Sequence, residues 1–412
     1  MNTDWSGLEE STGFKKIRAT FWRQADIGYI FSFFVASRLL LEAIGLLSRI
    51  LIQPYLNYDY VWVYSNFVWL DIWGVWDTGW YLDIAGNGYD MVRKTSGPIA
   101  GQANWAFFPA YPMITAFISQ LTGLSPFAAM IAVSNLCFLV ALVILWRETA
   151  DEFGRSAARA TVALLCLTPG SYVFSSGYAE SLFLLVVSAT LALARRRRWV
   201  AAGLAAGIAA LTRNTGIGLV LPIILLGGKQ LVPLISGNGG RIPSDKRRSY
   251  TNEAWRIAAS ISIPMIALIG FGAFLYIRAG DPLAFVSIQD AWQRKIRSPT
   301  ETLFLPLLDP QSLPAMDILN WIFAWLSVVM LVQLARWRRW SLLALGIFFV
   351  FVPLSAGLLS YVRYTIVMLP VVMAAGALCA ERPVAMTLVL STLAAINGFM
   401  MSAWALGFPF VI

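Results

Sequence analysis

The stretch 73–90, WGVWDTGWYLDIAGNGYD, places carboxylates among aromatic side chains beside an apolar segment. Trp76, Trp80 and Tyr81 recur at helical spacing, which predicts a short amphipathic helix on the membrane surface. A carboxylate held there, such as that of Asp77, suits a general base that accepts the proton of an attacking hydroxyl. Aromatic faces also stack well on sugar rings. The alternative interpretation is an interfacial aromatic belt with a solvated Asp77.

Two arginines and a glutamate are further candidates. Arg213 lies in the middle of the apolar run 199–228, where a guanidinium is costly unless it is paired or lines a polar cavity. It marks either an ion pair or a functional site, and phosphate is a natural partner because a guanidinium binds two of its oxygens at once. Arg363, in SYVRY, has the same two interpretations. Glu180 begins an apolar segment, so it is either a first-turn acid favoured by the helix dipole or a member of the site.

Other chemistry is limited by the residue types. Histidine is absent and the three cysteines lie inside apolar runs, so neither a disulfide framework nor a metal site built on these ligands is expected. Asp59, Asp71 and Asp83 leave a divalent metal as an alternative, but they form no compact cluster, and we predict neither a metal site nor a cofactor. Arg38 and Glu42 are four residues apart in the first apolar run, which predicts a structural ion pair.

The elements that must position these residues are membrane helices. Of the 412 residues, 58% are hydrophobic and 13% are charged, and the apolar runs are continuous, as in a helical bundle rather than a barrel. The net charge of +9 is interpreted as membrane topology and not as nucleic-acid binding. The apolar runs lie near residues 27–51, 127–146, 158–175, 179–194, 199–228, 256–277, 315–335, 341–358, 364–380 and 384–405.

Basic clusters predict the topology of these runs. Of the 31 lysines and arginines, 21 fall on one side if 199–228 is two short spans broken at LTRNTG and if 107–122 enters the membrane without crossing it. About 11 spans with a cytoplasmic N-terminus follow. The expected parts are a cytoplasmic segment 1–26 without a cleaved signal peptide, a single transmembrane domain 27–412, outer loops 52–126 and 278–314, and a solvated cytoplasmic connector at 237–256 that touches anionic headgroups.

The ordered motifs resemble the PIG-V family, which comprises GPI mannosyltransferase II and its bacterial relatives in the GT-C superfamily of polytopic glycosyltransferases. The motifs are WDTGWYLDIAGNGYD, FFPAYP, GYAESLF, LTRNTG, GDPLAF with QDAW, and RY before the penultimate span, over about residues 30 to 380. The resemblance implies a GT-C bundle whose first outer loop carries a catalytic carboxylate. Asp77 matches the position of this carboxylate in the family's pattern, whereas Asp71 and Asp83 do not match it. The chain lacks eukaryotic elaborations, which suggests a prokaryotic plasma-membrane protein without a GPI acceptor.

The activity that this resemblance implies is transfer of a sugar, expected to be mannose, from a polyprenyl-phosphate carrier to a hydroxyl on the outer face of the membrane. Inversion at the sugar carbon is expected, with a glycolipid or another hydroxyl compound as acceptor. The predicted donor-binding residues are Arg213, Arg363, Tyr364, Phe108 and Tyr111. The predicted substrate groove consists of Trp76, Trp80, Tyr81, Glu180, Gln289 and Trp292.

Other functions remain open from the sequence. A transporter or flippase for a lipid-linked sugar should show broken helices in two related halves, whereas this sequence has one such break and no repeat. A GT-C enzyme that uses another sugar and a non-catalytic membrane subunit are further alternatives.

Overall fold

The computed structural model describes residues 26–56, 62–97, 99–235, 244–292, 294 and 296–409. Every regular element in these ranges is helical and none is a strand, which confirms the predicted all-helical class. Nearly all of segment 1–26, part of the connector 237–256, and Asp59 lie outside the described residues. Residues 244–256 were expected to be part of that connector, but they form the first turns of a long helix.

Each predicted apolar run contains at least one helix. In the described ranges, the helices that correspond to these runs are α2 (Ile27–Leu47), α6 (Pro126–Phe153), α7 (Arg155–Leu167), α8 (Glu180–Arg195), α9 (Trp199–Ala210), α10 (Val220–Ile235), α11 (Ser244–Ala279), α14 (Ile318–Arg336), α15 (Trp340–Leu354), α17 (Leu369–Ala380) and α18 (Pro383–Ala405). Six stretches among them are long and apolar enough to cross a membrane. Crossing by the shorter helices α7, α8, α9, α15 and α17 stays a prediction.

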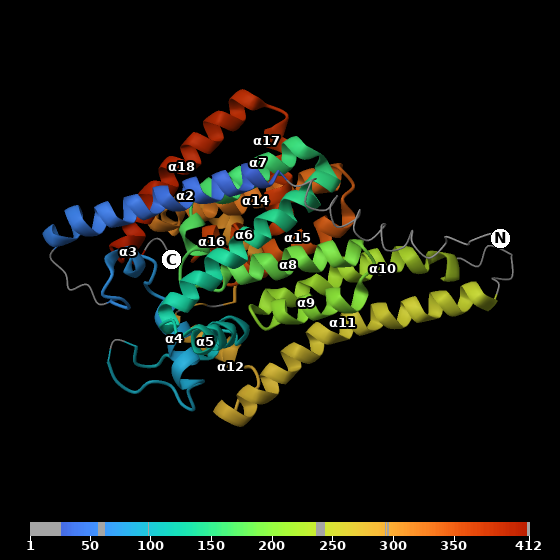
Figure 1. The fold of residues 1–412 in the computed structure, drawn as a ribbon, viewed down its shortest axis with the longest axis horizontal. Coiled ribbons are helices and arrows are strands. Elements are labelled where there is room, and N and C mark those ends of the chain that lie inside the picture. Colours follow the sequence, from blue (N-terminus) through green and yellow to red (C-terminus); the bar gives the residue numbers. More distant parts are fainter. Residues whose placement is uncertain are drawn as a thin grey trace, which may run out of the picture.

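In the described ranges, six further short α-helices lie between those of the bundle, and the five of them that Figure 1 labels gather at one end. We call this the site end. The short helices are α3 (Val68–Asp71), α4 (Thr78–Asn87), α5 (Ala110–Thr122), α12 (Ala284–Ser287), α13 (Pro299–Leu308) and α16 (Tyr361–Thr365). Most of them belong to the two long connections that were predicted as outer loops.

Helix α5 occupies the stretch that was expected to enter the membrane without crossing it. Its 13 residues span about 20 Å, whereas the hydrocarbon core of a bilayer is about 30 Å thick. In Figure 1 α5 is seen almost end-on while the long helices run across the view, so it lies across the bundle direction. It ends at Gly123, whose φ of 73° is the left-handed conformation that closes many helices. Both features agree with the prediction.

The predicted break at LTRNTG is present. Helix α9 ends at Ala210, Arg213 is extended with φ −154° and ψ 144°, and a 3-10 segment, Asn214–Leu219, leads into α10. The turn needs glycine at position 216, because a Cβ there would lie 2.3 Å from the carbonyl oxygen of Ala209. The break therefore takes Arg213 out of the helix and directs it toward the site end.

The opposite end of the bundle is rich in arginine, and we call it the basic end. Helix α8 begins with Glu180 and finishes with Arg195, which separates the two ends by about 24 Å. Arg195 and Arg339 both form ion pairs with Glu152, the latter at 3.1 Å. Basic residues from different turns therefore meet at one end, as the topology prediction requires.

The predicted ion pair between Arg38 and Glu42 is wrong. Arg38 is buried, and its guanidinium donates to the Ser171 carbonyl at 2.8 Å and the Ser171 hydroxyl at 2.6 Å. Glu42 instead accepts a hydrogen bond from the Trp73 indole at 2.8 Å, and no ion pair links it to Arg38 in the part of the chain that is described. The physical reason is that α7 ends at Leu167 and leaves carbonyls in its last turn that need donors, and the Cys166 carbonyl accepts a hydrogen bond from Arg38 at 3.4 Å. Arg38 thus fixes the segment that leads to Glu180.

Candidate active site

Asp77 lies at the N-terminus of α4, in a turn that is held by hydrogen bonds to a residue distant in the sequence. Trp76 has a left-handed φ of 51°, which a bulky residue adopts only when its surroundings impose it. The Tyr178 hydroxyl accepts a hydrogen bond from the Asp77 backbone N–H at 3.0 Å and donates to the Val75 carbonyl at 3.3 Å. The predicted amphipathic helix follows as α4 and ends at Gly88. The turn therefore presents the Asp77 side chain in a fixed direction.

Four charged residues form a continuous chain of ion pairs. Arg363 donates from Nη1 to Asp77 Oδ2 at 2.7 Å, and its Nε lies 3.1 Å from Glu180 Oε1. The same Glu180 oxygen accepts a hydrogen bond from Arg213 Nη1 at 2.8 Å. The structure therefore brings together four residues that were singled out separately in the sequence. Arg213, for which an ion pair was one of the two interpretations, is paired with Glu180.

Burial differs along this chain of ion pairs. The Glu180 side chain is 2% exposed and that of Arg363 is 9% exposed, whereas Asp77 and Arg213 keep 18% and 17%. Asp77 Oδ1 has no hydrogen-bond donor among the described residues. The base candidate and the phosphate-binding candidate are thus the two members that a ligand can reach.

Glycine and backbone geometry explain how Glu180 and Arg363 reach Asp77. A Cβ on Gly177 would lie 2.7 Å from Thr78 Cγ2, so only glycine lets the segment before α8 pack against the start of α4. On the other side, Ser360 has a left-handed φ of 67° immediately before α16, the helix that carries Arg363. The close packing at Gly177 and the turn at Ser360 therefore bring Glu180 and Arg363 to the same site.

Tyr364 lies at the centre of three guanidiniums. The guanidinium carbon of Arg213 lies 4.7 Å from the centre of its ring, and that of Arg363 lies 5.6 Å from it. Arg294 Nη1 donates a hydrogen bond to its hydroxyl at 2.8 Å. Burial alone would raise the pKa of the Tyr364 phenol, but the three positive charges outweigh burial and lower this pKa to about 8. Tyr364 was predicted to bind the donor, and it lies next to Arg213 as that prediction requires.

An aromatic wall stands beside Asp77. Trp80 stacks on Phe107 with ring centres 5.9 Å apart, and Trp292 meets both rings edge-on at 6.0 and 6.1 Å. All three side chains are half-buried. Tyr81 lies behind the wall and is mostly buried, and its ring centre is 5.2 Å from that of Phe107. Trp80 and Trp292, which were predicted from distant motifs, thus line one surface.

Phe108 and Tyr111 do not fit the predicted donor contact. Phe108 is 5% exposed and packs against Phe271 and Phe285 in a small second core between α11 and α12. Tyr111 is fully buried and its hydroxyl hydrogen-bonds with the Ser134 hydroxyl at 2.8 Å. Phe108 lies just before α5 and Tyr111 in its first turn, and both side chains are buried in protein, so their contact with the donor stays a prediction. Phe107, their neighbour, is the residue of this motif that faces the site.

Two other predicted groove residues lie at the margin of the site. Trp76 packs its ring against Trp62 at 4.5 Å, and its buried indole Nε1 has no hydrogen-bond partner among the described residues. Gln289 is half-buried, and its amide donates to the Phe285 carbonyl within its own turn at 3.3 Å. Their expected contact with substrate stays a prediction.

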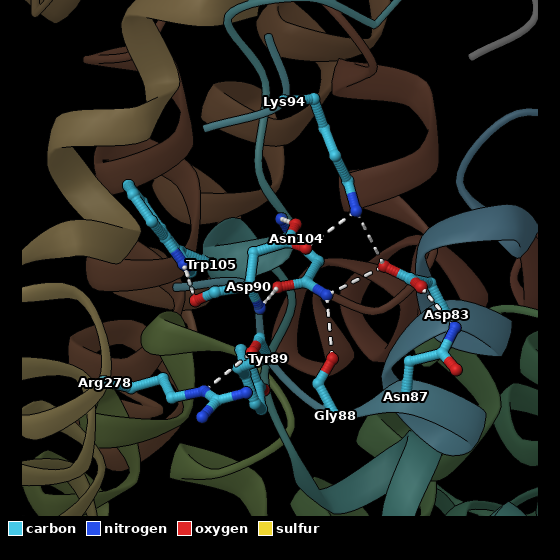
Figure 2. A network of polar contacts seen from close by, with 9 residues as sticks. All are labelled: Asp83, Asn87, Gly88, Tyr89, Asp90, Lys94, Asn104, Trp105 and Arg278. Atoms are coloured by element: carbon cyan, nitrogen blue, oxygen red, sulfur yellow. Dashed lines mark hydrogen bonds and ion pairs between the residues drawn. The ribbon is translucent and has the colours of Figure 1, made fainter. Parts of the chain in front are cut away.

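A polar network fixes the loop that follows α4 (Figure 2). Asn104 is fully buried and exchanges two hydrogen bonds with Asp90, at 3.0 and 3.1 Å. Its side-chain amide also donates to Asp83 at 3.0 Å, and Lys94 lies between both carboxylates. Arg278 of α11 reaches the Tyr89 carbonyl from the other side. The network therefore locks the end of α4 to the segment that carries Phe107.

Asp71 and Asp83, two of the aspartates for which a metal site was an alternative, have partners within the protein. Asp71 is buried, forms an ion pair with Arg49 and accepts hydrogen bonds from the backbone N–H groups of Tyr64 and Ser65. Asp83 is engaged in the network just described. In the described ranges, no group of three or more side chains is placed to hold a metal ion. The absence of a metal requirement stays a prediction.

Arg294 and Tyr178 are members of the site that the sequence did not reveal. Arg294 is the second residue after the QDAW motif, and only its nearness to that motif could have drawn attention to it. Tyr178 belongs to the GYAE motif, in which attention fell on the charged Glu180. Both act through contacts with residues far away in the chain, which no local pattern reports.

A cavity of about 470 Å³ lies at the basic end, away from Asp77. It is lined by Glu152, Phe153, Ser156, Ala157, Trp337, Arg339, Ala377, Ala380 and Glu381. Arg339 and Glu152 are paired with each other across it. The convergence of ion pairs, strained backbone and aromatic surface is found instead at the site end.

Comparison with known proteins gives partial matches. A family model described as dolichyl-phosphate-mannose-protein mannosyltransferase matches residues 107–238, which include Glu180 and Arg213 but not Asp77. No curated protein matches the sequence. The chain is similar to ArnT from Cupriavidus metallidurans bound to undecaprenyl phosphate, with 16% identity, a TM-score of 0.47, and coverage of 94% of this chain and 77% of that one.

Two further similar structures come from Archaeoglobus fulgidus. One is its oligosaccharyltransferase in complex with zinc and sulfate, with 14% identity, a TM-score of 0.46, and coverage of 90% of this chain and 53% of that one. The other is AglB with an inhibitory peptide and dolichol-phosphate, with 12% identity, a TM-score of 0.44, and coverage of 91% and 56%. The chain thus spans about half the length of these archaeal enzymes.

Proposed function

We propose that this protein is a membrane glycosyltransferase that moves a sugar from a polyprenyl-phosphate carrier to an acceptor hydroxyl, with Asp77 as general base. The observation that carries the proposal is the Asp77 carboxylate, which has one oxygen fixed by Arg363 and the other open beside an aromatic wall. The partial match to a mannosyltransferase family model and the PIG-V-like order of motifs support the reaction class and favour mannose as the sugar.

Each residue of the site has a role in this reaction. Asp77 Oδ1 accepts the proton of the acceptor hydroxyl while that oxygen attacks the anomeric carbon. The bond between this carbon and the phosphate oxygen breaks, and its electron pair stays on the phosphate, which leaves with one more negative charge. Attack from the side opposite the leaving group inverts the carbon. Arg213 stabilises the charge that develops on the phosphate.

Arg363 is assigned here to positioning rather than to direct phosphate binding. Both of its ion-pair partners among the described residues are carboxylates, and its side chain is 9% exposed. By bridging Asp77 and Glu180 it holds the base at a fixed distance from Arg213. The aromatic wall of Trp80, Phe107 and Trp292 would receive the apolar face of a sugar ring.

The proposed setting is the outer face of a prokaryotic plasma membrane, with a cytoplasmic N-terminus and a glycolipid or other hydroxyl compound as acceptor. The clustering of arginine at the basic end supports this orientation, because basic loops favour the cytoplasmic side.

The test uses the full chain in nanodiscs with radiolabelled polyprenyl-phosphate mannose and candidate acceptor extracts. Wild type should release polyprenyl phosphate, Asp77→Asn should reduce release at least a hundredfold, and the exposed Asp309→Asn should behave as wild type. Unchanged release by Asp77→Asn would eliminate the base assignment. Movement of the intact donor across the bilayer without release would instead identify a transporter.

A further inference from the structure

The charges around Tyr364 do not balance. Three guanidiniums, those of Arg213, Arg294 and Arg363, surround its ring or hydroxyl. Two carboxylates, those of Asp77 and Glu180, belong to the same cluster. The cluster thus carries one positive charge more than it can neutralise when Tyr364 is protonated.

This excess charge is located on Arg294. Arg363 contacts both carboxylates and Arg213 contacts Glu180, whereas the described partners of Arg294 are neutral. They are the Tyr364 hydroxyl at 2.8 Å and the Ser360 hydroxyl at 3.5 Å. Its Nε is buried and has no hydrogen-bond partner among the described residues. An unneutralised guanidinium in such a place is costly unless a negatively charged ligand joins it.

The orientation of the hydroxyl also favours an anion. Because the Tyr364 oxygen accepts the hydrogen bond from Arg294, its own proton is free to be donated. Arg213, stacked on the other side of the same ring, uses one of its donors for Glu180 and keeps others. Three sets of donors therefore lie around Tyr364, and a tetrahedral oxyanion can accept from more of them than a planar carboxylate, which has only two oxygens.

We propose that Arg294 and the Tyr364 hydroxyl bind the phosphate of the donor and hold it as the leaving group, opposite Arg213. The identity of the phosphate as that of the donor rests on the proposed function. Asp77 and the phosphate would then lie on the two sides of the cluster, joined through Arg363, Glu180 and Arg213. Trp292, two residues before Arg294, already lies in the aromatic wall, so the phosphate would be bound next to that wall.

Ionisation of Tyr364 provides a signal that a merely structural role would not give. Arg294, Arg363 and Arg213 face the phenol and lower its pKa to about 8. A bound phosphate would add negative charge next to the phenol and raise this pKa again. Conversely, the tyrosinate neutralises Arg294 above about pH 8, so phosphate binding should weaken as the pH rises.

The experiment measures two quantities on the full chain in nanodiscs. One is the affinity for undecaprenyl phosphate, and the other is the titration of Tyr364, taken as the difference in tyrosinate absorbance between wild type and Tyr364→Phe, with and without undecaprenyl phosphate or inorganic phosphate. The variants are Arg294→Gln, Arg294→Lys, and the exposed Arg297→Gln of the same segment as the control. A melting curve for each variant confirms folding.

We expect Arg294→Gln to weaken binding of undecaprenyl phosphate at least tenfold, Arg294→Lys to weaken it less, and Arg297→Gln to leave it unchanged. Undecaprenyl phosphate should raise the pKa of Tyr364 in wild type but not in Arg294→Gln. Wild-type affinity in folded Arg294→Gln, or a Tyr364 titration that no phosphate moves, would overturn the inference and leave the proposed function standing. An Arg294-dependent shift caused by inorganic phosphate, without binding of the carrier lipid, would keep the anion site and remove the proposed donor.

Discussion

The Arg363 guanidinium donates to Asp77 Oδ2 at 2.7 Å, although 286 residues separate them in the sequence. Arg363 simultaneously lies 3.1 Å from Glu180, so one planar side chain links the beginning of α4, the beginning of α8 and α16. A lysine could supply the charge, but its single nitrogen could not donate to Asp77 while a second nitrogen lies beside Glu180. The site therefore depends on the shape of arginine as well as on its charge.

Replacing Arg363 should separate these two contributions. Arg363→Gln leaves Asp77 and the buried Glu180 without their shared partner, so we expect a loss of about 3 kcal/mol in stability and no measurable turnover. Arg363→Lys should fold better and lose about tenfold or more in kcat with little change in the donor KM. Melting temperatures and steady-state kinetics measure both effects. Equal donor KM increases in both variants would indicate that Arg363 binds phosphate itself.

Gly177 should tolerate no side chain. Gly177→Ala places a Cβ 2.7 Å from Thr78 Cγ2, so we expect a loss of about 1–3 kcal/mol and a lower kcat because α4 shifts relative to Tyr178. Thr78→Ser removes that methyl group, and the double variant should recover part of both losses. A double variant no better than Gly177→Ala would show that the close contact is not the cause.

Arg38 and Glu42 should behave unequally. Arg38→Ala removes the donors to Ser171, so several buried oxygens lose their partner and the melting temperature should fall markedly. Glu42→Gln keeps an acceptor for the Trp73 indole and should change stability by less than about 1 kcal/mol. Similar losses in the two variants, with no further loss when they are combined, would restore the ion pair that the structure does not contain.

The lowered pKa of Tyr364 predicts a pH effect on stability. In the unfolded chain this phenol titrates near 10, whereas in the folded protein it titrates at about 8. Between these values the unfolded state binds more protons, so stability rises with pH and the contribution, up to about 3 kcal/mol, is lost as the pH falls through 8. Wild type should therefore gain stability relative to Tyr364→Phe between pH 8 and 10. Parallel melting curves for the two proteins across this range would contradict the prediction.

Trp292 should act on the acceptor. Trp292→Ala removes one of three rings in the aromatic wall, and we expect the acceptor KM to rise about tenfold at nearly constant kcat, because ring stacking contributes on the order of 1 kcal/mol. Trp292→Phe should retain much of the affinity. The exposed Trp255→Ala of α11, which lies far along the chain from this wall, serves as the control. A change in donor KM alone would place Trp292 on the other substrate.

The sequence predicted the helices well because membrane helices are defined by local composition. Apolar runs, the LTRNTG break and the short α5 all depend on patterns within about 20 residues. The cost of placing a charge in an apolar setting singled out Arg213, the surrounding aromatic residues singled out Asp77, and Glu180 was noted at the start of an apolar segment. This reasoning could not tell ion pairs from ligand contacts, because that distinction depends on which distant residue supplies the partner.

The errors have the same origin. The i, i+4 spacing of Arg38 and Glu42 permits an ion pair, but unsatisfied carbonyls near Ser171 compete for the guanidinium. Phe107 and Phe108 are neighbours of equal hydrophobicity, and only the direction of the chain as it enters α5 decides which one faces the site. Arg294 was missed because its importance comes from the neutral character of its partners, which a sequence does not record.

The chain of ion pairs has a consequence for biosynthesis. The ribosome synthesises its members in the order Asp77, Glu180, Arg213 and Arg363, so both carboxylates reach the membrane before either arginine. Glu180 is almost fully enclosed in the finished protein, and without the arginines it would be an unpaired charge among apolar helices. Arg213 can pair with Glu180 before α16 is made, whereas Asp77 has no ion-pair partner until α16 brings Arg363. A nascent chain stalled before that point would leave the Asp77 carboxylate uncompensated, a feature by which proteolytic quality control could distinguish it from the completed protein.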